Sequence, residues 1–278
     1  GSYSWRAGEQ MINTVYSKET ISNEIHTKWA GKTVHFAKET DSTNEWCKRL
    51  SKEDAEHGIL AVAEFQSAGK GRLGRKWTAP EGSSVMMSIL LRPKFEPQYA
   101  SMLTLVMGLS VAQAVRALGV EVSIKWPNDV VVSHKKICGI LTEMGLQDGK
   151  IREVVIGVGL NVNLEEIQED LRDKATSLYL ETGKTYDRNR LIGLVMENFE
   201  INYEKFVQTC DLSMMLDDYN MLLANKSQPV RVLDKISPYE GVALEIDKDG
   251  ALLVRVQSGE IRKVCSGEVS VRGLYSYI

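Results

Sequence analysis

The sequence Gln66-Ser-Ala-Gly-Lys-Gly-Arg-Leu-Gly-Arg-Lys-Trp77 decides between the fold classes open to this chain. It contains three glycines, four cationic side chains and one tryptophan in twelve residues. Glycines let backbone N–H groups approach an anion closely, cations supply charge, and a tryptophan offers a flat face for a ring. This stretch, called the glycine loop below, is therefore typical of a segment that binds a phosphorylated ligand carrying a ring.

The residues in and around the glycine loop, and the rest of the sequence, argue against the common nucleotide-binding folds. The loop fits G-x-G-x-x-G, but that dinucleotide fingerprint needs a strand before it and a helix after it. Residues 59–65 predict the strand, whereas residues 85–91 predict a second strand in place of the helix. A Walker A loop would need glycine at position 64 and serine or threonine at 71, where the chain has Glu64 and Gly71. The kinase sequences His-Arg-Asp and Asp-Phe-Gly are absent as well.

The composition is that of an ordinary globular protein. The 278 residues carry 34 Lys and Arg against 37 Asp and Glu, so the net charge of -3 does not attract nucleic acid to the chain as a whole. The four cysteines lie far apart and the four histidines lack metal-ligand spacing, which predicts a reduced protein without structural zinc. No apolar run reaches the ~18 residues of a membrane span, and a signal-peptide pattern is missing. We expect a cytoplasmic protein that binds neither nucleic acid nor membrane.

The hydrophobic periodicity predicts an alternation of helices and strands. Helices are expected at residues 17–29, 42–51, 99–118, 187–208 and 212–223. Strands are expected at 33–36, 59–65 and 85–91, and an antiparallel meander at 122–126, 130–132, 137–143 and 153–158. Ser42 and Glu45 fit a capping box. Asp187 fits a helix cap and Gly119 a helix stop. After the polar segment 225–229, five short strands with Asp-Gly and Ser-Gly turns predict a small C-terminal β-barrel or sandwich.

Three further segments carry groups that can act on a ligand. Lys125-Trp-Pro-Asn-Asp129 forms a turn between two expected strands, and Lys136-Ile-Cys-Gly139 follows seven residues later. Pro-Asn-Asp is also a common turn sequence, but an amide and a carboxylate beside two lysines can position a metal-bound nucleotide. Gly157-Val-Gly-Leu-Asn161 ends a strand with two glycines, which suit either a close ligand or a bulge.

In this order and spacing, the segments resemble the catalytic region of biotin protein ligases over residues 33–272. The motifs that carry the resemblance are Asp41-Ser-Thr-Asn44, the glycine loop, Lys125-Trp-Pro-Asn-Asp129, Lys136-x-x-Gly139, Gly157-x-Gly-x-Asn161 and Ser266-Gly-Glu-Val-Ser-Val-Arg272. The resemblance implies an α+β fold, with a mixed sheet flanked by helices as in class II aminoacyl-tRNA synthetases and lipoate ligases, and a small SH3-like β-barrel at the C-terminus.

The resemblance also implies a division of the chain. Residues 33–226 are expected to form the catalytic domain that binds biotin and ATP, and residues 227–278 the SH3-like domain. Residues 1–32 are expected to be a leader with a short helix, too short for the winged DNA-binding domain that some family members carry. The family forms homodimers, which leaves a homodimer open for this chain.

The activity implied by the resemblance has two steps. ATP, with Mg²⁺, activates biotin as biotinyl-5′-AMP, and a specific lysine of the biotin carboxyl carrier protein of a carboxylase then attacks the mixed anhydride. A lipoate or octanoate ligase of the same fold is the alternative enzyme. A non-catalytic sensor of biotin or nucleotide is the alternative from another class.

A set of site residues follows from the same resemblance. Those expected at biotin are Ser42, Thr43, Asn44, Gln66, Gly69, Lys70, Gly71, Arg72, Lys136, Gly139, Gly157 and Gly159. Those expected at ATP are Arg72, Arg75, Trp77, Lys125, Asn128, Lys136, Asn161 and Arg272. Catalysis is assigned to Arg72, Lys136, Asp129 and Asn128, with Mg²⁺ near Asp129 and no fixed structural metal site.

Particular roles follow for these residues. Arg72 is expected to hold the adenylate, because its guanidinium can bridge carboxylate and phosphate oxygens. Lys136 is expected to contact the biotin carboxylate and the α-phosphate, and Asp129 to help deprotonate the incoming lysine. For Arg272 and Glu268 three roles stay open: they reach back to the nucleotide, they lock the two domains together, or they form a surface ion pair.

Other assignments keep an alternative open. Trp77 is expected to stack on adenine while Asn161 reads the adenine edge, although core packing would also suit a tryptophan. Ser42 can serve as a helix cap as well as a biotin contact. Lys70 stands where the family usually has arginine, which keeps the charge but loses the planar fork.

Overall fold

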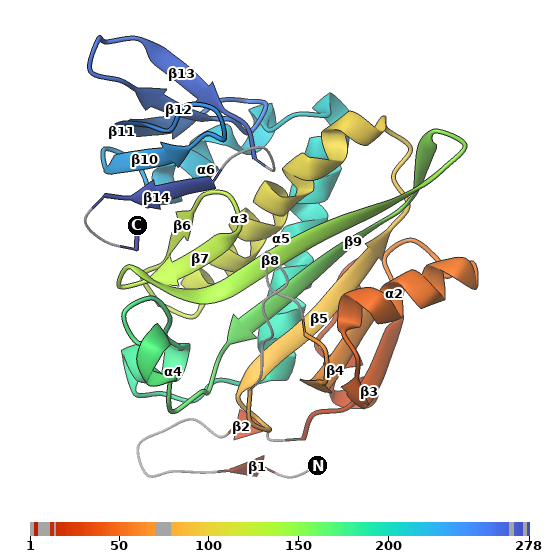
Figure 1. Ribbon diagram of the computed structural model, residues 1–278. Coiled ribbons are helices and arrows are strands. Elements are labelled where there is room, and N and C mark those ends of the chain that lie inside the picture. Colours follow the sequence, from red (N-terminus) through yellow and green to blue (C-terminus); the bar gives the residue numbers. More distant parts are fainter. Residues whose placement is uncertain (1–2, 5–11, 14, 70–78, 267–269, 275–276) are drawn as a thin grey trace.

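The computed structural model of the protein describes residues 3–4, 12–13, 15–69, 79–266, 270–274 and 277–278. Its centre is a seven-stranded sheet with the strand order β3-β4-β5-β9-β8-β7-β6 (Figure 1). The strands are β3 (Val34–Thr40), β4 (Leu60–Gln66), β5 (Ser84–Leu91), β6 (Ser123–Lys125), β7 (Asp129–Val132), β8 (Lys135–Gln147) and β9 (Lys150–Asn161). β3 and β4 run parallel and every other neighbouring pair is antiparallel, which confirms the mixed sheet and the meander of its last four strands. A separate pair, β1 (Tyr3–Ser4) and β2 (Ile12–Asn13), is also antiparallel.

Helices cover the two faces of the central sheet unequally. They are α1 (Lys18–Ser22), α2 (Thr43–Lys52), α3 (Leu103–Ala117), α4 (Leu178–Thr182), α5 (Arg188–Thr209) and α6 (Leu216–Leu222), with 3₁₀ turns η2 (Pro97–Met102), η3 (Glu169–Leu171) and η4 (Ser213–Met215). α3 and α5 pack together across one face, whereas α2 lies on the other face against β4, β5 and β9 (Figure 1). The second face is therefore left accessible over part of β8 and β9.

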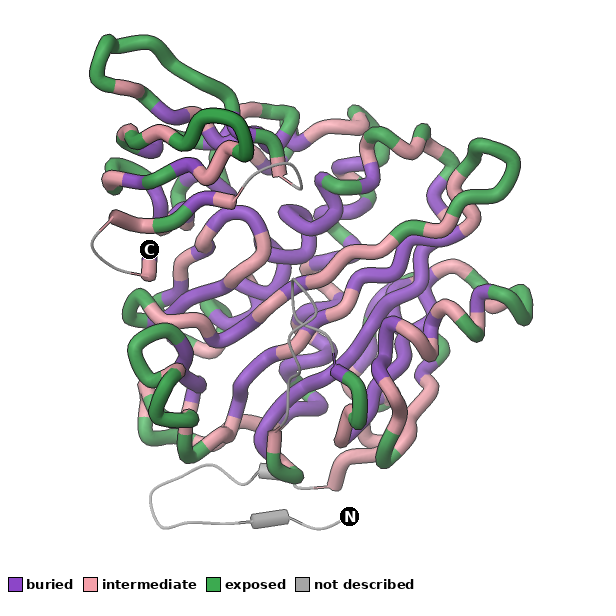
Figure 2. Tube along the Cα trace, viewed as in Figure 1, coloured by how far each residue is buried: buried purple, intermediate pink, exposed green. Residues whose placement is uncertain are grey.

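α3 is the core helix of the fold. Its residues are mostly apolar, and nearly all of them are buried. With the turn before it, the segment Pro97–Ala117 is long and apolar enough by length and composition to cross a membrane, yet 78% of its most apolar stretch is buried inside the protein. α3 packs on α5 and on the sheet, as the core helix of a soluble fold does. In Figure 2 the buried segments lie at the centre of the molecule, and the exposed segments lie mainly in loops at its edges.

The C-terminal strands form a second, five-stranded antiparallel sheet. They are β10 (Pro229–Leu233), β11 (Tyr239–Ile246), β12 (Leu252–Arg255), β13 (Ile261–Val264) and β14 (Ser270–Gly273), in the order β13-β12-β11-β10-β14. Among the described residues the edge strands β13 and β14 do not pair, so the sheet stays open rather than closing into the expected barrel. Three of the four residues of β13 are exposed, so this short edge has little apolar surface with which to close.

The two sheets share one hydrophobic core. Trp126 is fully buried, and its Nε1 donates to the Gly250 carbonyl at 2.9 Å while its backbone N–H donates to Asn225 Oδ1 at 2.8 Å. A Cβ placed on Gly250 would lie 3.3 Å from Leu105 and 3.5 Å from Leu212. The turn between β11 and β12 therefore enters the core that α3 builds, and apolar residues of both sheets belong to the same buried cluster.

The N-terminal helix is the main departure from the predicted elements. The predicted cap of α2 is present, because Ser42 Oγ accepts from the Glu45 N–H at 3.1 Å. The helix predicted at 17–29, however, ends at Ser22. Beyond it, Glu200 of α5 accepts the backbone N–H groups of residues 28–30 at 2.8–3.1 Å. A carboxylate from a distant helix thus takes the N–H groups that a longer α1 would have used.

Candidate functional site

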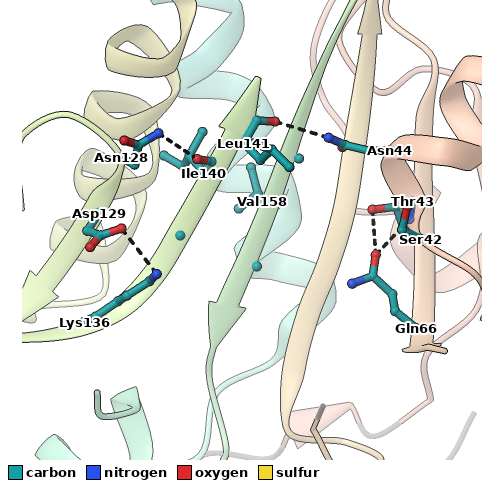
Figure 3. Close-up of a pocket in the computed structure, with 13 residues that line it drawn as sticks. Ser42, Thr43, Asn44, Gln66, Asn128, Asp129, Lys136, Ile140, Leu141 and Val158 are labelled. Atoms are coloured by element: carbon teal, nitrogen blue, oxygen red, sulfur yellow. Dashed lines mark hydrogen bonds and ion pairs between the residues drawn. The ribbon is translucent and has the colours of Figure 1, made fainter. Parts of the chain in front are cut away.

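A cavity opens on the sheet face that α2 leaves accessible (Figure 3). Its lining comes from the N-terminus of α2, the end of β4, the turn between β6 and β7, and facing segments of β8 and β9. The lining residues are Ser42, Thr43, Asn44, Gln66, Asn128, Asp129, Lys136, Gly139, Ile140, Leu141, Gly157, Val158 and Gly159. Motifs that are far apart in the sequence therefore meet at one place.

Glycines form the floor of the cavity. Gly139 of β8 and Gly159 of β9 lie directly opposite each other in the strand register. A Cβ on Gly159 would meet nothing within 4 Å, whereas a Cβ on Gly139 would lie 3.0 Å from the Lys136 side chain. A Cβ on Gly157 would collide with Asn44 Oδ1. Position 159 thus leaves open space above the sheet, and the other two glycines make room for the side chains that border it.

The α2 side of the cavity presents neutral polar groups. The Thr43 N–H donates to Gln66 Oε1 at 2.8 Å, and Thr43 Oγ1 lies 3.2 Å from the same oxygen. The Gln66 NH₂ group points away from this contact (Figure 3). Ser42, the N-cap of α2, completes this side. Because its oxygen is already engaged, Gln66 offers a ligand its hydrogen-bond donors.

Asn44 is held by groups that lie behind the lining. Its Nδ2 donates to Glu143 Oε1 at 2.9 Å and to the Leu141 carbonyl at 3.3 Å. Ser88 Oγ, fully buried on β5, lies 2.5 Å from Asn44 Oδ1. Lys48 Nζ pairs with the other Glu143 oxygen at 2.7 Å. Both ends of the Asn44 amide are therefore bound within the protein.

The opposite side of the cavity is charged. Lys136 Nζ lies 3.4 Å from Asp129 Oδ1, and the Tyr277 hydroxyl donates to the other Asp129 oxygen. Burial, together with the negative charge of Asp129, raises the pKa of Tyr277, so the phenol remains a donor at neutral pH. Asn128 Nδ2 donates to the Ile140 carbonyl at 3.1 Å, while its Oδ1 is buried without a hydrogen-bond partner among the described residues.

The two sides together suit a ligand with two different ends. The hydroxyl and amide groups of Thr43 and Gln66 match an uncharged ring that has both N–H and C=O groups. The ammonium of Lys136 matches a carboxylate or a phosphate. A molecule that joins a polar ring to an anionic group through an apolar middle would satisfy both sides and the glycine floor.

The structure brings most of the described predicted site residues to this cavity. Those in the lining are Ser42, Thr43, Asn44, Gln66, Asn128, Asp129, Lys136, Gly139, Gly157 and Gly159. Gly69 is buried outside the lining. Residues Lys70, Gly71, Arg72, Arg75, Trp77 and Glu268 lie outside the described part of the chain.

Three residues predicted at ATP are described but do not line the cavity. Asn161 is fully buried, because the segment around Thr176 covers this end of β9 and the Thr176 carbonyl accepts from Asn161 Nδ2 at 3.0 Å. Lys125 Nζ lies 4.0 Å from the centre of the Tyr277 ring. Arg272 is exposed on β14, opposite Arg231 of β10.

Sequence reasoning missed several residues of the site. Ile140, Leu141 and Val158 belong to the lining, while Ser88 and Tyr277 contact its polar groups from behind. Ser88 had a signal, because it is an isolated polar residue in an otherwise apolar central stretch of β5. Tyr277 had none, because its contact with Asp129 joins positions that are 148 residues apart.

Comparison with known proteins finds the same family along most of the chain. Residues 36–161 match the family model described as the Biotin/lipoate A/B protein ligase family, and residues 228–272 match the Biotin protein ligase C terminal domain. The Bifunctional ligase/repressor BirA of Bacillus subtilis is 33% identical over 260 residues, which span 92% of this chain and 79% of that protein. The biotin acetyl-CoA-carboxylase ligase of Mycobacterium tuberculosis is 34% identical over 220 residues, which span 76% of this chain and 78% of that protein.

Solved structures give the same result for the fold. The biotin protein ligase from Aquifex aeolicus in complex with biotin and ATP matches with a TM-score of 0.76 at 33% identity, over 87% of this chain and 99% of that chain. The biotin protein ligase from Leishmania major in complex with biotinyl-5-AMP matches with a TM-score of 0.55 at 22% identity, over 84% of this chain and 99% of that chain. At the lower identity the likeness concerns the fold alone.

Proposed function

Because this chain belongs to the biotin protein ligase family, we propose that it is an ATP-dependent ligase that attaches biotin to a specific lysine of a biotin carboxyl carrier protein. In the first step the biotin carboxylate attacks the α-phosphorus of ATP, which forms biotinyl-5′-AMP and releases pyrophosphate. In the second step the carrier lysine attacks the acyl carbon, which forms the amide and releases AMP. Activation is needed because a carboxylate oxygen is a poor leaving group and AMP is a good one.

The observation that carries this proposal is the division of the cavity into a neutral and a charged side. Biotin has a ureido ring with two N–H groups and one C=O at one end, and a carboxylate at the other. Thr43 and Gln66 supply polar groups for the ring, and Lys136 supplies the cation for the carboxylate. The apolar chain between the two ends would lie over Gly159, where no side chain intervenes.

In the proposed first step Lys136 stabilises negative charge. Its ammonium would contact the biotin carboxylate and the α-phosphate as charge moves onto the phosphate oxygens. Asp129 holds Lys136 in place at 3.4 Å and is itself held by the Tyr277 hydroxyl. In the second step Asp129 would take a proton from the carrier lysine, which must be neutral to attack.

The residues beside Lys136 also fit Mg²⁺ that enters with ATP. Magnesium prefers oxygen ligands, and the carboxylate of Asp129 lies next in sequence to Asn128, whose Oδ1 is buried without a partner among the described residues. Mg²⁺ bound there would neutralise phosphate charge during transfer.

We propose that the glycine loop supplies most of the remaining contacts to the nucleotide. Arg72 would hold the adenylate and Arg75 the ATP phosphates, with Trp77 stacked on adenine. Lys125, Asn161 and Arg272 stay predictions for the ATP site, and none of them lines the cavity as described. Residues 33–226 would act as the catalytic domain and 227–278 as a C-terminal domain. A cytoplasmic location and a homodimer are proposed with them.

A carrier-labelling assay tests the proposal. The protein is incubated with biotin, MgATP and an apo biotin carrier domain, and the carrier is then weighed by mass spectrometry. We expect one biotinyl group on one carrier lysine, and none when ATP is omitted. Absence of any mass gain would reject the ligase and favour a non-catalytic sensor. Pyrophosphate exchange that proceeds with lipoate but not with biotin would reject biotin as the substrate and favour a lipoate or octanoate ligase.

A further inference from the structure

A line of polar side chains runs from the cavity wall into the protein behind α2. Thr43 Oγ1 lies 2.7 Å from Ser88 Oγ, and Ser88 Oγ lies 2.5 Å from Asn44 Oδ1. Asn44 Nδ2 donates to Glu143 Oε1 at 2.9 Å, and Lys48 Nζ lies 2.7 Å from the other oxygen of that carboxylate. Ser88 is fully buried and does not line the cavity, so it can act on a ligand only through the lining residues that it contacts, Thr43 and Asn44. Both ends of the Asn44 amide are already bound within the protein, which leaves Thr43 as the route to the ligand.

The charged end of this line determines which way each hydrogen points. The Glu143 carboxylate and the Leu141 carbonyl can only accept, so the NH₂ group of Asn44 must face them. The Asn44 carbonyl must then face Ser88, and it takes the single hydroxyl hydrogen of that residue. The 2.7 Å contact between Ser88 and Thr43 also needs a hydrogen, and once the Ser88 hydrogen faces Asn44 only the Thr43 hydroxyl can supply it. Gln66 Oε1 competes for the same Thr43 hydrogen, but it lies farther away at 3.2 Å and already accepts the Thr43 N–H.

The neutral side of the cavity therefore has a fixed polarity. With its hydrogen turned toward Ser88, Thr43 presents a lone pair to the cavity and can accept there but not donate. Gln66, whose oxygen is held by the Thr43 N–H, presents donors. A donor group of the ligand is thus matched at position 43 and an acceptor group at position 66.

We propose that Ser88, supported by Asn44 and Glu143, is a positioning residue that sets the Thr43 hydroxyl as an acceptor and so makes the cavity select a ligand N–H group beside it. This inference rests on the proposed function, in which the selected group is a ureido N–H of biotin. A ring that carries oxygen in place of that N–H would bring two lone pairs together at Thr43. Wild-type protein could relieve this only by turning the Thr43 hydrogen away from Ser88, which leaves their 2.7 Å contact without a hydrogen.

The test compares biotin with the two cyclic carbamate analogues in which oxygen replaces one or the other ureido N–H. For one of the two, wild-type protein should bind the analogue about a hundredfold less tightly than biotin. In Ser88→Ala the Thr43 hydrogen is released and can donate to the ring oxygen. The ratio measured is the dissociation constant of the weaker-binding analogue divided by that of biotin, both obtained by titration calorimetry. This ratio should be about tenfold lower in Ser88→Ala than in the wild type.

Two further variants separate positioning from general damage. Ser110→Ala is the matched control, because it removes another fully buried hydroxyl, which donates to the Val106 carbonyl within α3. Its ratio should equal that of the wild type. Thr43→Val should lower the ratio by itself, and adding Ser88→Ala should lower it no further, since Ser88 acts through Thr43. A partly unfolded sample does not alter the ratio, because both ligands are titrated into the same protein.

The outcomes are distinct. An unchanged ratio in Ser88→Ala, with biotin still bound by the wild type, overturns the positioning role and leaves the proposed function intact. A further fall in the double variant also overturns it, because Ser88 would then reach the ligand by another route. If wild-type protein does not bind biotin, the proposed function fails and this inference fails with it.

Discussion

At the scale of single residues, the cavity is shaped by missing side chains as much as by those present. Gly157 and Gly159 are two residues apart on β9 and point to the same face of the sheet. A Cβ on Gly157 would collide with Asn44 Oδ1, whereas a Cβ on Gly159 would meet nothing within 4 Å. The same change at these two positions should therefore act on different properties of the protein.

We expect Gly157→Ala to lower the free energy of unfolding by about 1–3 kcal/mol, because Asn44 must move from its three partners. Gly159→Ala should leave stability within about 0.5 kcal/mol of the wild type but raise the biotin dissociation constant about tenfold, because the methyl group enters the ligand space. Chemical denaturation and titration calorimetry of both variants check this. Equal loss of stability in the two variants would contradict the assignment of open space to position 159.

Lys136 gives a prediction on the chemical step. Lys136→Ala should slow biotin-dependent pyrophosphate exchange about a hundredfold or more, because the charge that stabilises the α-phosphate is lost. Lys150→Ala, which removes an exposed lysine at the tip of the β8–β9 hairpin, is the matched control and should exchange at the wild-type rate. A fall confined to the transfer of preformed biotinyl-AMP would show that Lys136 acts in the second step instead.

At the scale of elements, Glu200 links α5 to the segment that follows α1. Burial by itself would raise the pKa of Glu200, but the backbone N–H groups of residues 28–30 outweigh it and lower that pKa. A carboxyl whose pKa is lower in the folded than in the unfolded state stabilises the fold above the unfolded pKa of about 4.3. This stabilisation is lost as the pH falls below that value through the folded pKa.

We therefore expect Glu200→Gln to lower the free energy of unfolding at pH 7 by about 1–2 kcal/mol. The new NH₂ group would face the Lys28 N–H, and since both groups are donors this hydrogen bond would be lost. The loss of stability on acidification below about pH 4.3 should also become shallower than in the wild type. Glu197→Gln, a partly exposed change one turn earlier on α5, is the control and should keep the wild-type pH dependence. Parallel pH profiles for wild type and Glu200→Gln would contradict the role of the carboxylate.

The elements that could be predicted from sequence are those with a local signal. Ser42 and Asp187 cap α2 and α5 because each has its cap acceptor and N–H donors within three residues. The end of α1 could not be predicted, because Glu200 lies about 170 residues away from the N–H groups it accepts. The same limit applies to the site. The motifs predicted most of the lining but not Ile140, Leu141 and Val158. The contacts of Ser88 and Tyr277 depend on how strands and the C-terminal tail meet in space.

At the scale of the whole molecule, the two sheets should unfold as one unit. Trp126 joins them through its Nε1 bond to the Gly250 carbonyl, and their apolar residues form one cluster. Domains that share a core lack the exposed linker and small interface that permit independent unfolding. We expect a single thermal transition when the near-ultraviolet and far-ultraviolet circular dichroism are followed together.

Trp126→Phe tests this coupling. The change leaves the Gly250 carbonyl without its donor, so the free energy of unfolding should fall by about 1–3 kcal/mol while the transition stays single. Trp46→Phe, on the partly buried face of α2, removes a tryptophan away from the second sheet and should cost less. Two separate transitions in the wild type, one for each sheet, would show that the shared core does not couple them.

The turn at Gly250 also bears on how such proteins can be recombined. Because this turn packs against Leu105 and Leu212, the C-terminal sheet cannot be exchanged between relatives as an independent domain. A chimera with a foreign C-terminal sheet would need compensating residues on α3 and after α5, where the turn enters. Sequence exchange at residues 225–229 alone should therefore give poorly folded hybrids, even though that polar segment looks like the natural crossover point.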